Sequence, residues 1–222
     1  MCGRFAFFSP SEAVTAAFGV SFDFQFEARY NIAPTQDVIV LRSGEQGQMV
    51  ADRCRWGLVP FWAKDPAIGN RMINARAETV TEKPAYRQSF DKRRCLVLAS
   101  GFYEWRKEAT AKTPYFICRD DRKPFGMAAI WDEWRQGDDG VLRSCAIITA
   151  PANEFMQKLH HRMPVLMDGS AASDWLSPGR RADELQQALL QSQRVKLEAW
   201  PVSRTVNSPH NEGPELIAQA DA

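Results

Sequence analysis

The chain has 222 residues, of which 45% are hydrophobic and 25% are charged, and its formal net charge is +1. This length suits one large domain with its own core, and the composition excludes a wholly disordered chain. The near-neutral charge excludes nucleic-acid binding by overall charge, so any such binding must depend on local clusters of arginine.

Short β-like runs separated by turn residues, such as the turn predicted at Gly137–Gly140, recur along the chain, and they predict antiparallel pairing. The predicted strands are Arg4–Phe8, Val38–Arg42, Met49–Trp56, Arg94–Ala99, Phe102–Arg106, Tyr115–Arg119, Phe125–Trp131, Ser144–Thr149 and Val165–Met167. Helices are predicted at Ser11–Phe18, Ala152–Leu159 and Ala182–Gln191. Strands in runs with helices at the flanks indicate an α+β fold, with a mainly antiparallel, strongly bent sheet or a partly closed barrel.

We expect one domain over residues 1–222, with residues 218–222 as a frayed tail. No run approaches the roughly 18 apolar residues of a membrane span, and the first residues lack the layout of a signal peptide. We therefore expect a cytoplasmic, monomeric protein that does not act at a membrane.

The five cysteines lie at positions 2, 54, 95, 118 and 145. Their odd number and the absence of a C-x-x-C spacing argue against a disulfide framework and against a zinc site. Neighbouring histidines such as His160 and His161 normally point apart. We therefore predict no metal and no cofactor.

Cys2 follows the initiator methionine directly, so removal of Met1 leaves one residue with a free α-amine and a thiol. An α-amine titrates near pH ~8, so part of it is uncharged at neutral pH. With an aldehyde, the amine forms a Schiff base and the sulfur closes a five-membered ring; with an amide, the sulfur attacks while the amine serves as base. The third interpretation is a small residue that merely permits removal of Met1.

Three further segments carry polar groups in patterns that suit a reactive site. Strand alternation places Asn74, Arg76 and Glu78 on one face, which is also how the solvated side of an ordinary strand looks. Glu104 lies among large aromatics, where desolvation raises a carboxyl pKa, although a half-exposed strand glutamate fits equally well. His160 and His161 precede Arg162, and we expect one imidazole to face the site.

These segments together resemble one family, the SOS-response-associated peptidase (SRAP) family of DNA-repair proteins that capture abasic sites. The matching segments are Met1–Phe5, Arg29–Thr35, Arg55–Pro60, Ile73–Glu78, Arg94–Leu96, Gly101–Trp105, His160–Pro164 and Pro201–Ser203. They span nearly the whole chain and occur in the order of the family.

The resemblance implies that mature Cys2 reacts with the aldehyde of an abasic site in single-stranded DNA and closes to a thiazolidine. It implies roles for Asn74 in orienting the lesion or the Cys2 amine, for Glu104 as acid and base, and for His160 in ring opening and proton transfer. By the same resemblance, Arg4, Arg76 and Arg162 hold phosphates, and Pro34, Trp62 and Thr149 map near the DNA-facing surface.

The resemblance further implies that the word peptidase describes autocatalytic removal of Met1, with a possible lyase activity and an association with the nucleoid when DNA is bound. Phe61 departs from some relatives, which carry a different aromatic there. Two alternatives stay open: an N-terminal-cysteine glutamine amidotransferase, which also begins Met-Cys-Gly, and a non-catalytic single-strand binder that uses Trp62 and the arginines.

Overall fold

The computed structural model describes residues 2–108, 111–135, 140–191 and 195–220. Within these ranges the strands are β1 (Phe5–Phe7), β2 (Arg29–Ile32), β3 (Asp37–Ser43), β4 (Met49–Trp56), β5 (Asn74–Arg76), β6 (Arg94–Ala99), β7 (Gly101–Lys107), β8 (Lys112–Arg119), β9 (Phe125–Arg135), β10 (Val141–Pro151), β11 (Arg162–Pro164), β12 (Leu166–Met167) and β13 (Leu197–Pro201). The α-helices are α1 (Ser11–Phe18), α2 (Arg87–Lys92), α3 (Glu154–Gln157), α4 (Gly169–Leu176) and α5 (Ala182–Gln191); short 3₁₀ turns are η1 (Pro66–Arg71), η2 (Arg204–Asn207) and η3 (Pro214–Ile217).

Five strands close into a barrel. β10 pairs with β4, β4 with β3, β3 with β6, β6 with β9, and β9 pairs again with β10. Only the β10–β4 pair of this ring is parallel. The predicted α+β class with a mainly antiparallel barrel is confirmed, and the barrel is closed within the described residues rather than partly open.

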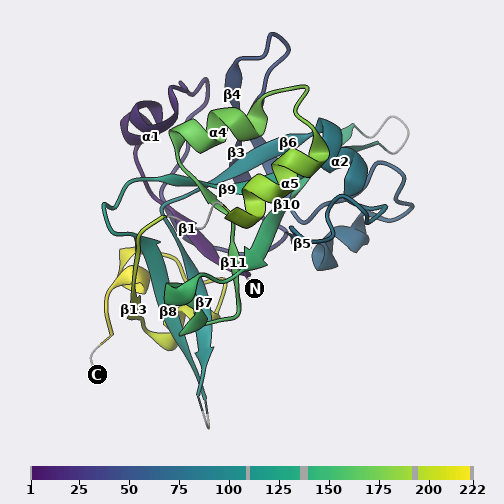
Figure 1. Ribbon diagram of the computed structural model, residues 1–222. Helices are drawn as coiled ribbons and strands as arrows, with labels where there is room; N and C mark the ends of the chain where they lie inside the picture. The colour runs from purple at the N-terminus through teal and green to yellow at the C-terminus, as the bar shows by residue number, and fades with distance from the viewer. Residues whose placement is uncertain (1, 109–110, 136–139, 192–194, 221–222) are drawn as a thin grey trace.

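A second sheet, in the order β13-β8-β7-β1-β2, is antiparallel throughout. The chain passes from the barrel to this sheet at Ser100 and Gly101, between β6 and β7. A Cβ on Gly101 would lie 2.2 Å from the Phe116 ring, so only glycine fits this crossing. In Figure 1 the β7–β8 hairpin extends below the barrel, while α4 and α5 lie over its strands.

The large apolar core fills the barrel and extends to residues of α1, α4 and α5. All five cysteines are free and buried. No helix in the described part of the chain is long and apolar enough to cross a membrane.

Local sequence explains why two predicted helices match their observed bounds. α1 begins after Pro10 and ends at Gly19, whose φ of 70° provides the left-handed C-cap. α5 buries Leu185 and Leu189 on one face and exposes Leu190. The helix predicted at Ala152–Leu159 is wrong in length, because only Glu154–Gln157 is helical before the chain turns toward β11.

The end of the chain differs from the expected frayed tail. Gln219 forms a β-bridge with Val202, and the Ala220 N–H donates to the Pro201 carbonyl at 2.9 Å. The backbone is therefore held through Ala220, and residues 221–222 lie outside the described residues, as does most of the turn predicted at Gly137–Gly140.

Candidate active site

Pairing of β10 assembles one side of the candidate site. β5 lies parallel to β10 and places Asn74 opposite Ile147, while β11 pairs antiparallel with the end of the same strand. The turn that carries His160 leads into β11. β10 thus brings residues about 75 positions apart in the sequence into one neighbourhood.

The second sheet supplies the other side of the site. Phe5 of β1 pairs with Phe102 of β7, and the Tyr103 N–H donates to the Arg4 carbonyl at 2.9 Å. This register runs the first residues of the chain alongside β7. Figure 1 shows the N-terminus near β11 and the end of β10, where the barrel and the second sheet meet.

Two direct contacts link the four predicted catalytic residues. Asn74 Nδ2 donates to the Cys2 carbonyl at 2.7 Å, and Glu104 Oε2 lies 4.0 Å from His160 Nδ1. The Glu104 carboxylate is also close enough to contribute to the raised pKa of the Cys2 thiol. The structure therefore brings Cys2, Asn74, Glu104 and His160 together.

Cys2 is fully buried in the chain that still carries Met1, and its thiol belongs to the large apolar core. Burial, with the charge of Glu104 as a smaller cause, raises the thiol pKa to about 12. Cys2 therefore does not face an open groove in the unprocessed chain. Its thiol is protonated there at neutral pH.

Glu104 is only 4% exposed, and burial raises its pKa above the ordinary value of a glutamate. Of the two interpretations of its aromatic surroundings, the structure supports the desolvated carboxyl rather than the half-exposed strand residue. Such a group gives up and takes back a proton closer to neutral pH.

The histidine pair differs from the expectation that the two rings point apart. The rings of His160 and His161 stack with centroids 4.3 Å apart and an interplanar angle of 27°, because both residues lie in a turn rather than in a strand. His160 Nδ1 lies 3.0 Å from the Arg162 N–H and 3.2 Å from the Arg162 carbonyl oxygen, so Arg162 engages this nitrogen in either tautomer of the neutral ring. Burial lowers the His160 pKa and favours this neutral form.

Arg162 does not stand free to bind a phosphate, as the resemblance had implied. Its side chain is 9% exposed, its guanidinium pairs with Glu78, and it donates to the Thr149 carbonyl at 2.6 Å. Thr149 is fully buried, so its expected place on the DNA-facing surface is also wrong. The two corrections are linked, because the Arg162 guanidinium lies 3.3 Å from Thr149 Oγ1 while it pairs with Glu78.

The charges of Arg4 and Arg76 are not compensated by a carboxylate among the described ion pairs, but the two side chains are held differently. Arg4 donates to the Asn31 side chain at 2.7 Å and to the carbonyls of Val206 and Asn207 at 2.8 and 3.5 Å. These acceptors are neutral, so they fix the guanidinium without cancelling its charge. Arg76 is exposed beside the site, at the end of β5.

Pro34 and Trp62 lie outside the hydrogen-bonded group around Cys2. Pro34 is half-buried just after β2, and Trp62 is 49% exposed in the loop after β4. The alternation predicted for Asn74, Arg76 and Glu78 is confirmed, because Ala75 and Ala77 between them are buried.

Sequence reasoning missed two residues that organise this site. Asn31 is 1% exposed, and its Nδ2 donates to the carbonyls of Ser208 and Asn211 at 2.9 and 2.8 Å while its oxygen holds Arg4. The Tyr86 hydroxyl donates to the Asn74 carbonyl at 3.3 Å. Asn31 lies within the matching segment Arg29–Thr35, between Tyr30 and Ile32. A polar side chain between two such residues was the feature of the sequence that could have indicated its role.

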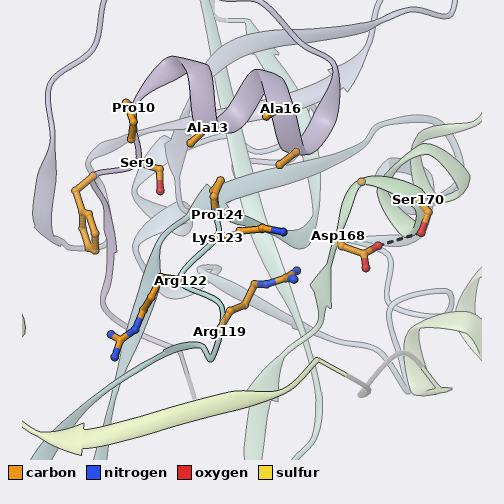
Figure 2. A pocket seen from close by; sticks show the side chains of 13 residues that line it. Ser9, Pro10, Ala13, Ala16, Arg119, Arg122, Lys123, Pro124, Asp168 and Ser170 are labelled. Carbon is orange, nitrogen blue, oxygen red and sulfur yellow. Dashed lines mark hydrogen bonds between the residues drawn. The ribbon is translucent and has the colours of Figure 1, made fainter.

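A cavity of about 720 Å³ lies elsewhere, between α1 and the turn that follows β8. Figure 2 shows Arg119, Arg122 and Lys123 along this cavity. Arg119 pairs with Asp121 at 2.8 Å and Arg122 with Glu198 at 2.6 Å, so these charges are largely compensated. Cys2 is not among the lining residues, and the cavity is not part of the candidate site.

The chain is similar to known proteins over nearly its whole length. The family model described as SOS response associated peptidase (SRAP) matches residues 1–209. The abasic site processing proteins YoaM and YoqW of Bacillus subtilis are 38% and 37% identical over 223 residues, which cover 98% of this chain and 97% and 99% of the relatives. A crystal structure of a protein from Bacteroides thetaiotaomicron superposes with a TM-score of 0.88 at 26% identity, covering 99% of this chain and all of that one.

Proposed function

Because the chain belongs to the SOS response associated peptidase family, we propose that it processes abasic sites in single-stranded DNA by a covalent link through Cys2. Its relatives YoaM and YoqW are named abasic site processing proteins. The proposal is supported by the hydrogen bond from Asn74 to Cys2, by the proximity of Glu104 to the Cys2 thiol, and by the contact of His160 with Glu104.

The first step is hydrolysis of the Met1–Cys2 peptide bond, which consumes one water and frees the Cys2 α-amine. The raised thiol pKa keeps the sulfur protonated before this step. Asn74 holds the carbonyl of Cys2, and its own Oδ1 has no hydrogen-bond partner among the described residues. This oxygen is the acceptor that we assign to the newly formed amine or to the lesion.

The second step joins the amine to the aldehyde carbon of the opened sugar. The carbinolamine loses water when protonated Glu104 donates to the departing hydroxyl, which leaves an iminium and a Glu104 carboxylate. The carboxylate then takes the thiol proton as the sulfur attacks the iminium carbon, and a thiazolidine forms. The sum is aldehyde plus aminothiol giving thiazolidine plus water, with Glu104 returned to its starting form.

The placement of both nucleophiles on one residue makes the capture durable. An imine alone is readily hydrolysed, whereas ring closure by a sulfur already held next to the same carbon costs little further entropy. Neutral His160, which lies 4.0 Å from Glu104, is placed to assist opening of the closed sugar. Arg4 and Arg76 supply the positive charge for the flanking phosphates.

Intact-protein mass spectrometry after incubation with an abasic single-stranded oligonucleotide tests the proposal. We expect loss of Met1 and an added mass equal to the DNA minus one water, located at residue 2. Cys2→Ser should lose the stable adduct, while Cys118→Ala, which removes another buried thiol, should keep it. An undiminished adduct in Cys2→Ser would refute the cysteine mechanism.

A further inference from the structure

Phe61 and Trp62 are the most exposed large hydrophobic side chains of the described residues, each 49% exposed. They lie in loop 57–63, between β4 and η1. The first part of this loop, residues 57–60, is buried. The loop therefore has a buried stem that presents two aromatic side chains to solvent.

Three side chains of the barrel form hydrogen bonds with the backbone of loop 57–63. Ser144 Oγ accepts the Val59 N–H at 2.7 Å, and Asp132 Oδ2 accepts the Phe61 N–H at 3.0 Å. The Trp134 indole donates to the Ala63 carbonyl at 2.7 Å. Asp132 and Trp134 belong to β9, and Ser144 of β10 pairs directly with Asp132.

Of these three hydrogen bonds, the one to Asp132 involves a residue of the aromatic pair, Phe61. Its side chain is 3% exposed, and its second oxygen, Oδ1, accepts from the Arg93 guanidinium and from the Glu133 N–H at 2.8 Å. Because Oδ1 is held on this side, the direction of Oδ2 toward the Phe61 N–H is fixed. The orientation of the Phe61 backbone thus depends on the pair between buried Asp132 and half-buried Arg93.

Positive side chains accompany the aromatic pair. A cavity of about 450 Å³ beside Trp62 is lined by Lys64 and Arg71. Aromatic faces with nearby cations are the usual means of binding single-stranded nucleic acid, because every base offers a face for stacking. We infer that Asp132 is a positioning residue that sets loop 57–63 so that Phe61 and Trp62 stack against bases next to the lesion; this rests on the proposed function.

A double-mutant cycle between Asp132 and Phe61 tests the inference. Affinity for an intact single-stranded oligonucleotide is measured by fluorescence anisotropy, so no covalent chemistry is involved. We expect Asp132→Ala and Phe61→Ala each to weaken binding about fivefold or more, the range for loss of one stacked base. The double variant should lose less affinity than the product of the two single losses, because Asp132 acts partly through Phe61.

Two variants separate positioning from stability. Asp132→Asn keeps one acceptor oxygen for the Phe61 N–H but turns its NH2 group toward Arg93 and the Glu133 N–H, so it should weaken binding less than Asp132→Ala does. Asp52→Asn is the matched control: Asp52 also pairs with arginines, Arg42 and Arg143, but does not contact loop 57–63. It should bind DNA like the wild type.

The inference is overturned if the losses from Asp132→Ala and Phe61→Ala multiply in the double variant, or if Asp132→Ala binds normally. If Asp132→Ala does not fold, amide hydrogen exchange of the wild type tests the inference instead. The Phe61 amide should be protected from exchange. Exchange at the rate of a free amide would exclude the hydrogen bond between the Phe61 N–H and Asp132. A wild-type protein that binds DNA through this loop but forms no adduct would contradict only the proposed function.

Discussion

Asn74 donates a hydrogen bond of 2.7 Å to the carbonyl of Cys2, the residue whose amine the proposed reaction needs. The contact joins β5, beside the barrel, to the first residues of the chain. Asn74 is held in turn by β10, through the parallel pairing of β5. The geometry of the reactive terminus is therefore set by a strand more than 140 positions away in the sequence.

Asn74→Ala should slow adduct formation about tenfold or more, because it removes the hydrogen bond that orients Cys2. Adduct formation over time on an abasic oligonucleotide measures the rate, and mass spectrometry reports whether Met1 is still removed. Asn70→Ala is the matched control, since Asn70 is exposed and contacts Arg55 rather than Cys2. Equal rates for the two variants would remove Asn74 from the mechanism.

Glu104→Gln should slow adduct formation by about 100-fold, the lower range for loss of a general acid. It should also change the pH dependence of stability. Because burial raises the Glu104 pKa, the stabilisation attached to its proton is present below about pH 4.3 and is lost as the pH rises through the raised pKa.

Glutamine does not titrate, so the melting temperature of Glu104→Gln minus that of the wild type should increase between pH 4 and pH 8. Thermal unfolding at several pH values measures this difference. Glu108→Gln serves as control, because Glu108 is exposed and Arg106 lowers its pKa. A flat difference for Glu104→Gln would contradict a desolvated carboxyl.

Arg162→Ala should lower the free energy of unfolding by about 2 kcal/mol, because Arg162 is buried and holds both Glu78 and the Thr149 carbonyl. The value is below that of a fully buried pair, since the Glu78 side chain is 37% exposed and can hydrate. Urea unfolding measures it. An unchanged stability together with weaker DNA binding would restore Arg162 as a phosphate contact.

Arg76→Ala should weaken DNA binding rather than stability, because the Arg76 side chain is exposed at the end of β5. The slope of log affinity against log salt for single-stranded DNA should fall in magnitude by about 0.7, the value for one phosphate contact. Stability should stay unchanged. Anisotropy titrations in a Cys2→Ser background measure the slope without covalent reaction, and an identical slope would exclude the contact.

The chemistry that removal of Met1 would give Cys2 could be predicted from the sequence, because an aminothiol depends only on covalent structure. Local patterns also sufficed for α1, which Pro10 and Gly19 delimit, and for the alternation along residues 73–78. Each of these features is decided by residues close together in the chain.

Only the tertiary structure decided which arginines stay available and how Cys2 is covered. Arg162 and Arg4 look alike in the sequence, yet Glu78 neutralises the first, while neutral oxygens from Asn31 and the 206–207 segment hold the second. Thr149 is buried, and its hydroxyl lies 3.3 Å from the Arg162 guanidinium. Burial and charge compensation come from partners distant in the chain, so they cannot be predicted from a local sequence pattern.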